Sequence, residues 1–227
     1  MRTFRANAID FMRHLPLFQE LNEAELRQLE AMAEHKIIKK NHFIYHADDA
    51  SDAMYFLVKG IVKIGNEAED GREVIKHILH PMAIFGELGL TGEQWRQDGA
   101  QAMEEVHVYR IPLCDFQKLM QCNYKLAMSV LAMIGNRLKR VEDRLESLMF
   151  KDARERIIDF LKDSATKQGK RIGYETLIKH CYTQQDIANI TGTSRQTVTS
   201  VLNELKKSNL IFFNRRSILI RDMAKLA

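Results

Sequence analysis

The chain has 227 residues, which is enough for two modest domains with separate cores. Its 34 Lys and Arg against 30 Asp and Glu give a net charge of +4, and its three cysteines (Cys114, Cys122 and Cys181) have the spacing of neither a disulfide framework nor a zinc site. No apolar run approaches the roughly 20 residues that span a membrane, and the N-terminus has no signal-peptide pattern, so we expect a cytoplasmic protein without a membrane partner.

The first half of the chain changes from a helical to a strand-like pattern. Residues 4–34 are predicted to be helical, with a break at 15–18 and a second helix capped by Asn22. From about His35 to Ile111, turn-rich segments separate short β-rich runs, and a polar hairpin lies at 67–71. The expected strands are Lys36–Lys40, Met54–Lys59, Val62–Gly65, Val74–Leu79 and Val106–Ile111. This pattern predicts a small antiparallel sandwich or roll.

A short helix from Pro112 to about Gln121 is followed by a much longer one, capped by Asn123, whose apolar residues recur in alternating steps of three and four. That spacing is the seam of a coiled coil, and dense charge flanks it. Packing within the domain explains part of the stripe near Tyr124 and Ala127, whereas the later half predicts a parallel homodimer. The predicted interface residues are Leu131, Ile134, Leu138, Val141, Leu145 and Leu148.

A further helix is expected over residues 152–168, with Asp152 as its cap and as a hinge. The stretch 183–209 then has the pattern of two short helices joined by a tight turn. Thr183 and Ser194 can cap the two helices, and Gly192 suits the turn because positive φ costs glycine little. The inward stripe of the second helix is Val198, Val201, Leu202 and Leu205.

The outer side of that second helix favours DNA recognition, because its first two turns carry an Arg, an amide and two hydroxyls but no acid. The alternative is a solvated helical hairpin in which Arg195 is only hydrated. The strand–turn–strand pattern of 210–220 predicts a β-hairpin wing, and residues 151–227 hold 15 Lys and Arg against 8 Asp and Glu, a net of +7. The predicted DNA-binding residues are Thr183, Gln184, Ser194, Arg195, Gln196, Thr199, Ser200, Arg215 and Arg216.

These patterns together predict an α+β chain in three parts. A sensor-like β-roll occupies 1–122, a dimerisation helix 123–151 and a winged helix-turn-helix domain 152–227.

Over nearly all of its length the chain resembles the Crp/Fnr family of bacterial transcription regulators. The resemblance is carried by Phe85-Gly86-Glu87-Leu88-Gly89-Leu90, by the heptad helix and by Ser194-Arg195-Gln196-Thr197-Val198. It implies an effector-sensing jelly roll of the cyclic-nucleotide-binding type in the first part of the chain. It also implies that an effector in this roll repositions the two recognition helices of a dimer on a palindromic operator, with half-sites roughly 34 Å apart. It also makes RNA polymerase a candidate partner.

For the effector, the resemblance implies backbone amides near Gly86 and Leu88 at a phosphate and Glu87 at a ribose hydroxyl. The family's phosphate-binding Arg and small hydroxyl residue match Arg96 and Gln97, and its purine-contacting positions match Val141 and Glu142. Gln97 is bulkier than Ser, Asp98 adds a carboxylate, and neither helix residue offers a hydroxyl. We therefore favour a structural turn for residues 86–89, assign no cofactor, and leave a cyclic nucleotide open as effector.

Other interpretations remain open at this point. An iron–sulfur sensor would need several N-terminal cysteines, and none precedes Cys114. A haem sensor would use a histidine such as His42, His46, His77, His80 or His107. The regulator could also bind DNA without an effector. A metal-dependent roll enzyme would need a histidine cluster, for which only His42 and His46 have suitable strand spacing. We expect a regulator and not an enzyme, with its direction of control and its operator undetermined.

Overall fold

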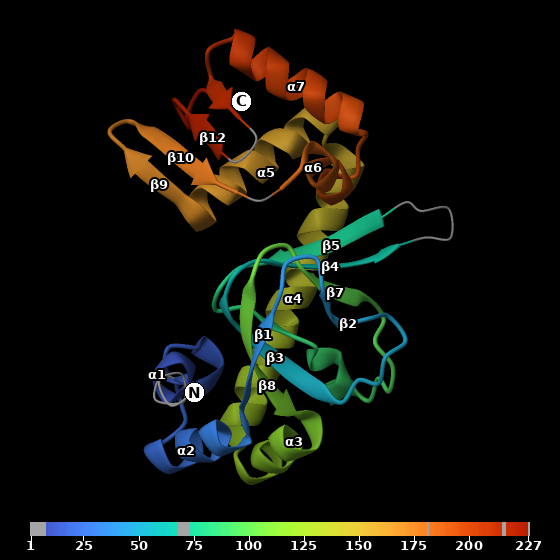
Figure 1. The fold of residues 1–227 in the computed structure, drawn as a ribbon, viewed down its shortest axis with the longest axis vertical. Helices are drawn as coiled ribbons and strands as arrows, with labels where there is room; N and C mark the ends of the chain where they lie inside the picture. The colour runs from blue at the N-terminus through green and yellow to red at the C-terminus, as the bar shows by residue number, and fades with distance from the viewer. Residues whose placement is uncertain (1–7, 68–72, 181, 215–216, 227) are drawn as a thin grey trace. The chain divides into compact units, whose positions relative to one another are not determined.

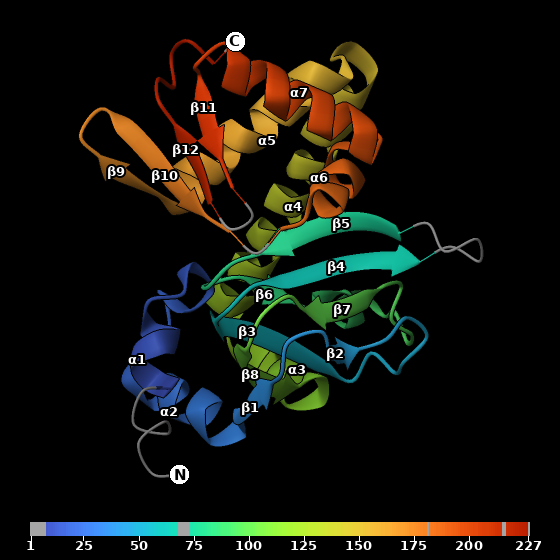
Figure 2. The ribbon, with the colours of Figure 1, turned by 45° about the horizontal axis from the view of Figure 1, so that its top comes forward.

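The computed structural model describes residues 8–67, 73–180, 182–214 and 217–226 (Figures 1 and 2). The described residues pack as two compact units, the first within Met1–Arg72 and Lys76–Arg140 and the second within Glu73–Ile75 and Val141–Ala227. The division falls inside the long helix, so the three-part boundaries expected from the sequence stay a prediction. No helix in these ranges is both long and apolar enough to cross a membrane.

The first unit combines helices with a β-roll. Its helices are α1 (Ala8–Arg13), the 3-10 helix η2 (Pro16–Phe18), α2 (Glu23–Met32), the 3-10 helix η3 (Glu87–Thr91), α3 (Leu113–Cys122) and the N-terminal part of α4 (Tyr124–Phe150). The strands of the roll are β1 (Glu34–Ile38), β2 (Phe43–Tyr45), β3 (Ala53–Lys59), β4 (Val62–Glu67), β5 (Glu73–Leu79), β6 (Ile84–Phe85), β7 (Gly99–Ala102) and β8 (Val106–Pro112).

These strands form two four-stranded sheets, in the orders β1-β8-β3-β6 and β2-β7-β4-β5. Side chains alternate across a strand, so β3 serves two cores. Its Tyr55 and Leu57 face the interior of the roll with Val62, whereas Phe56 packs with Phe18 of η2 among the helices. The predicted α+β class with an antiparallel roll is confirmed. Strands β2, β6 and β7 were not predicted, because they are too short to show a period.

Local capping explains where several helices begin. The side chain of Asn22 accepts from the backbone N–H groups of Ala24 and Glu25, at 2.9 and 3.0 Å, as predicted. Asn123 accepts from the N–H of Leu126 at 2.9 Å at the start of α4. Pro112 differs from its prediction, because it ends β8 and precedes α3 instead of beginning the helix.

The second unit contains the C-terminal part of α4 and a helix-turn-helix with a small sheet. Its other elements are α5 (Ala153–Gln168), β9 (Gly169–Ile172), β10 (Glu175–Lys179), α6 (Gln184–Thr191), α7 (Arg195–Lys207), β11 (Ile211–Phe213) and β12 (Ser217–Ile220). The sheet order is β11-β12-β10-β9 (Figure 2). Asp152 caps α5 through the N–H of Glu155 at 2.9 Å, as predicted, whereas the β9–β10 hairpin was not predicted.

Candidate nucleic-acid interface and effector site

Helix α6 and the turn after it have the geometry that the sequence predicts. The Thr183 hydroxyl accepts from the N–H of Asp186 at 3.1 Å, and the Asp186 carboxylate accepts from the N–H of Thr183 at 2.7 Å. Gly192 follows the helix with φ 63° and ψ 46°, the left-handed conformation that glycine adopts without strain. Ser194 then caps α7 by accepting from the N–H of Thr197 at 3.0 Å. The turn and both caps are therefore local consequences of these residues.

Helix α7 buries one stripe and exposes another, as predicted. Val198, Val201, Leu202 and Leu205 are at most 6% exposed. Arg195, Gln196 and Ser200 are exposed, and no acid lies in the first turn. The Arg195 guanidinium and the Gln196 amide are thus exposed at the N-terminal end of α7, the end that enters the major groove in helix-turn-helix proteins, where they can contact base edges.

Besides the caps Thr183 and Ser194, two more of the predicted DNA-binding residues, Gln184 and Thr199, are engaged within the protein. The Thr199 hydroxyl, on a partly buried residue, lies 2.8 Å from the side-chain oxygen of Gln184 and 2.9 Å from the carbonyl oxygen of Arg195. This bond ties α7 to the start of α6 and leaves the Gln184 amide nitrogen available. Any contact of Thr199 with DNA stays a prediction, because its hydroxyl already has acceptors.

The predicted wing is present as an antiparallel pair, in which Phe212 lies opposite Leu219 and Phe213 opposite Ile218. Lys206 of α7 lies above the rings of Phe212 and Phe213, at 5.2 and 5.5 Å from the ring centroids. Arg215 and Arg216, predicted at the tip of the wing, lie outside the described residues.

In the roll, the predicted effector segment begins at a tight turn that requires glycine. Gly86 has φ 79°, and a Cβ there would lie 2.8 Å from a guanidinium nitrogen of Arg96 and 2.9 Å from the carbonyl oxygen of Ala53. Gly89 is similarly enclosed, against the Ser51 hydroxyl at 2.7 Å. A structural-turn role therefore explains both glycines.

Glu87 is not explained by the turn. Its side chain is 2% exposed and forms an ion pair with Arg137 of α4 through one carboxylate oxygen. The other oxygen, Oε2, is buried and has no hydrogen-bond partner among the described residues. Burial lowers the pKa of the Arg137 guanidinium, which nearby Arg140 lowers further. An orphaned buried acceptor is costly, so this oxygen is a place where a ligand hydroxyl or N–H would be stabilised.

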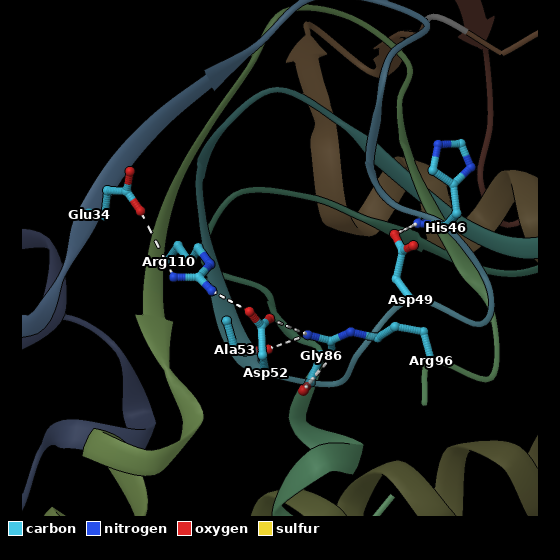
Figure 3. Close-up of polar contacts among 8 residues, drawn as sticks. All are labelled: Glu34, His46, Asp49, Asp52, Ala53, Gly86, Arg96 and Arg110. Carbon is cyan, nitrogen blue, oxygen red and sulfur yellow. Dashed lines mark hydrogen bonds and ion pairs between the residues drawn. The ribbon is translucent and has the colours of Figure 1, made fainter. Parts of the chain in front are cut away.

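Arg96 is 5% exposed and lies at the centre of the network in Figure 3. It donates from Nη1 to the carbonyl of Gly86 at 2.9 Å and from Nη2 to that of Ala53 at 2.6 Å. Its guanidinium carbon lies 4.4 Å from the ring centroid of Tyr45, whose pKa is raised by burial. Asp52 is 4.0 Å from Arg96 and 2.6 Å from Arg110. The Arg96 guanidinium therefore stabilises one carbonyl of the turn, that of Gly86, and one at the start of β3, that of Ala53.

The remaining residues of the predicted effector set are more dispersed. Leu88 is 40% exposed, and Gln97 is exposed and donates to Glu93 at 3.1 Å. Val141 and Glu142 are exposed on α4, in the part of that helix that belongs to the second unit. Asp98, whose negative charge disfavours an anion nearby, forms an ion pair with Lys76 at 3.2 Å. The Lys76 ammonium offsets that negative charge.

A cavity of about 500 Å³ in the first unit adds residues that the sequence did not indicate. Its lining includes the apolar residues Leu17, Leu79 and Met133, whereas Glu87, Arg137 and Arg140 supply charge. Arg137 and Arg140 lie off the heptad stripe and look like ordinary solvated cations in the sequence. Only the approach of α4 to η3 shows that Arg137 pairs with a buried acid.

The heptad residues of α4 are exposed over most of the helix. The exposed fractions of Leu131, Leu138 and Leu145 lie between 58% and 61%, and Val141 and Leu148 are also exposed. Ile134 differs, because it is partly buried against the helical core of the first unit. A regular row of exposed leucines at this spacing has the pattern of a coiled-coil seam.

The histidines considered as metal ligands have other surroundings. His42 lies 3.1 Å from the carbonyl oxygen of Lys40, and the His46 ring stacks on Phe43. In the parts of the chain that the structure describes, no cluster of three or more His, Cys, Asp or Glu side chains could hold a metal.

Comparison with known proteins agrees with this geometry. Residues 35–123 match the Cyclic nucleotide-binding domain family, and residues 155–227 match the Crp-like helix-turn-helix domain family. The CRP-like cAMP-activated global transcriptional regulator of Mycobacterium tuberculosis is 27% identical over 211 residues, covering 93% of this chain and 94% of its own. The cAMP-activated global transcriptional regulator CRP of Escherichia coli is 31% identical over 187 residues, covering 82% and 88%.

Among solved structures, FixK2 from Bradyrhizobium japonicum has the same fold, with a TM-score of 0.77 at 24% identity, covering 86% of this chain and 95% of its own. The similar proteins are transcription regulators, so the prediction of a regulator and not an enzyme is confirmed. The chain belongs to the Crp/Fnr family and is an effector-sensing, DNA-binding transcription regulator built from a cyclic nucleotide-binding domain and a Crp-like helix-turn-helix domain.

Proposed function

We propose that this regulator acts in the cytoplasm as a homodimer that reads a palindromic operator with the N-terminal half of α7. The observation that carries the proposal is the exposed first turn of α7, where Arg195 and Gln196 project from a helix whose other face is buried. Arg can make a two-pronged contact to guanine and Gln to adenine. Electrophoretic selection from random duplexes tests this, because a dimer should enrich inverted repeats with half-sites about one helical turn apart.

The homodimer is supported by the exposed seam of α4. Leu131, Leu138 and Leu145 recur at heptad spacing, and the helix that carries them is 27 residues long. A helix of this length provides more than three heptads for a parallel pair. The dimer would present two copies of α7 to the two half-sites, which is why dimerisation and operator binding should be lost together.

For the effector, we propose a small hydroxyl-bearing anion, with a cyclic nucleotide as the first compound to test. Oε2 of Glu87 would accept from the ligand hydroxyl, and Arg96 would exchange a carbonyl contact for the anion. The named relatives are cAMP-activated, and residues 35–123 match the Cyclic nucleotide-binding domain family. RNA polymerase is part of the proposal as the partner that a bound dimer would meet, and in vitro transcription from an operator-containing promoter tests that contact.

Glu87→Gln should weaken cyclic-nucleotide binding by about tenfold or more in calorimetric titrations with cAMP and cGMP. The reason is that a hydrogen bond to a charged acceptor contributes roughly 1.5–3 kcal/mol, and the amide is a weaker acceptor. Glu104→Gln is the matched control, since it removes one charge from an exposed residue of the first unit that is not in the predicted effector set.

Two results would count against the effector assignment. Equal affinities of wild type and Glu87→Gln would remove Glu87 from the site. No detectable heat with either nucleotide, together with operator binding that does not change when nucleotide is added, would favour the regulator that acts without a cyclic nucleotide.

A further inference from the structure

Two arginines from different helices meet the turn that joins α6 to α7. Arg156, near the start of α5, donates from Nε to the carbonyl of Thr191 at 2.8 Å and from Nη2 to that of Gly192 at 3.2 Å. Arg144, in the C-terminal part of α4, donates from Nη2 to the carbonyl of Ile190 at 2.7 Å. Three consecutive carbonyls at the end of α6 are therefore held by this arginine pair, Arg144 and Arg156.

The carbonyls at this point need external donors. The last carbonyls of a helix have no intrahelical partner and carry the negative end of its dipole. Within the turn, the N–H groups of Gly192 and Thr193 both bond to the carbonyl of Ala188. The carbonyls of Ile190, Thr191 and Gly192 are the ones that the arginine pair binds. A guanidinium suits this task because its five N–H groups are spread over three nitrogens in a rigid planar fork, whereas the three N–H groups of an ammonium share one nitrogen.

The other end of Arg156 reaches the junction between α4 and α5. Its Nη1 donates to the carbonyl of Lys151 at 2.7 Å. Lys151 lies between Phe150, which ends α4, and Asp152, which caps α5. One guanidinium thus connects the α4–α5 junction to Gly192, two residues before the cap of the recognition helix at Ser194.

We infer that Arg144 and Arg156 are positioning residues for DNA recognition, which set the start of α7 from the α4–α5 junction. The inference rests on the proposed reading of DNA by α7. A change at the junction would move the turn, and with it Arg195 and Gln196, without any contact between the arginine pair and DNA. The opposing view is that the packing of α5 against α6 and α7 positions the helix alone, and that the arginines add only stability.

The test compares Arg156→Gln, Arg156→Lys and Arg144→Gln with the control Lys167→Gln. Lys167 is on the same helix as Arg156 and, in the described part of the chain, forms an exposed ion pair with Asp163 at 2.7 Å. Lys167→Gln therefore removes the same charge as Arg156→Gln. Affinity is measured at several salt concentrations for a duplex selected by the wild type and for a random duplex, and the melting temperature is measured in parallel.

Arg156→Gln should lose about tenfold or more in affinity for the selected duplex, as expected for the loss of hydrogen bonds from a charged donor. Its affinity for random DNA and its salt dependence should match those of Lys167→Gln, because Arg156 is not proposed to neutralise a phosphate. Arg156→Lys should stay close to Arg156→Gln, since charge without the fork does not hold three carbonyls. Arg144→Gln should show the same selective loss on a smaller scale.

Several outcomes would overturn the inference: parallel losses on selected and random DNA, a lower melting temperature with unchanged operator affinity, or full recovery in Arg156→Lys. If Arg156→Gln does not fold, Arg144→Gln and Arg156→Lys provide the test, through the ratio of their affinities for the selected and the random duplex. Arg195→Ala in the same assay distinguishes failure of the positioning role from failure of the proposed reading of DNA by α7. Selective loss in Arg195→Ala alone rejects the positioning role, whereas no loss in either rejects the reading of DNA by α7.

Discussion

Replacing Leu138 and Leu145 with Glu should convert the dimer to a monomer and lower operator affinity by roughly 10²–10⁴-fold. Both residues are 58% exposed in the single chain and occupy one heptad position of α4. Acids at that position would face their copies across the seam, where burying unpaired carboxylates is strongly unfavourable. The loss exceeds that of any single base contact, because a monomer must bind each half-site alone.

Sedimentation velocity and operator titration together measure this effect. Lys139→Glu is the control, because it introduces an acid on the same helix beside the seam and not within it. The control should remain dimeric and bind the operator with a modest loss from its changed charge. A double variant that stays dimeric, or a monomer with full operator affinity, would contradict the proposed assembly.

Arg195→Ala should lose roughly 1–3 kcal/mol at the selected operator and relax the preference at one base pair of each half-site. Arg195 is exposed in the first turn of α7 and follows the cap at Ser194, so nothing in the described structure prevents it from entering a groove. The effect should be large because a bidentate contact to guanine is lost in both half-sites.

Lys207→Ala provides the comparison for that prediction. It removes the same charge from the last turn of α7, where the residue is exposed and far along the helix from the cap. This variant should weaken selected and random duplexes alike, with a shallower salt dependence. If Arg195→Ala behaves in the same way, Arg195 contacts phosphate and does not read a base, and the recognition residues must be sought at Gln196 and Ser200.

The features that could be predicted from the sequence are those that depend on residues close together in the chain. Four helices are capped by side chains that bond to groups two or three residues away, namely those of Asn22, Asp152, Thr183 and Ser194. Gly192 adopts its left-handed conformation because glycine has no side chain to oppose it. The heptad stripe and the alternating strands are periodic, so their faces follow from spacing. These local signals sufficed for the α+β class, the roll, the long helix and the winged helix-turn-helix.

Tertiary structure decided what depends on partners distant in the chain. Among the described residues, strand β9 pairs with β10 alone, and β10 joins the hairpin to the rest of the sheet through its pairing with β12. Glu87 becomes a half-satisfied buried acid only where α4 brings Arg137 to it. Nothing in the sequence distinguishes Arg156 from other cations near the start of a helix. Its role follows from the folded structure, in which it donates to the carbonyls of Thr191 and Gly192. Spacing along a chain specifies a face, but a buried charge acquires its role from whatever the fold packs against it.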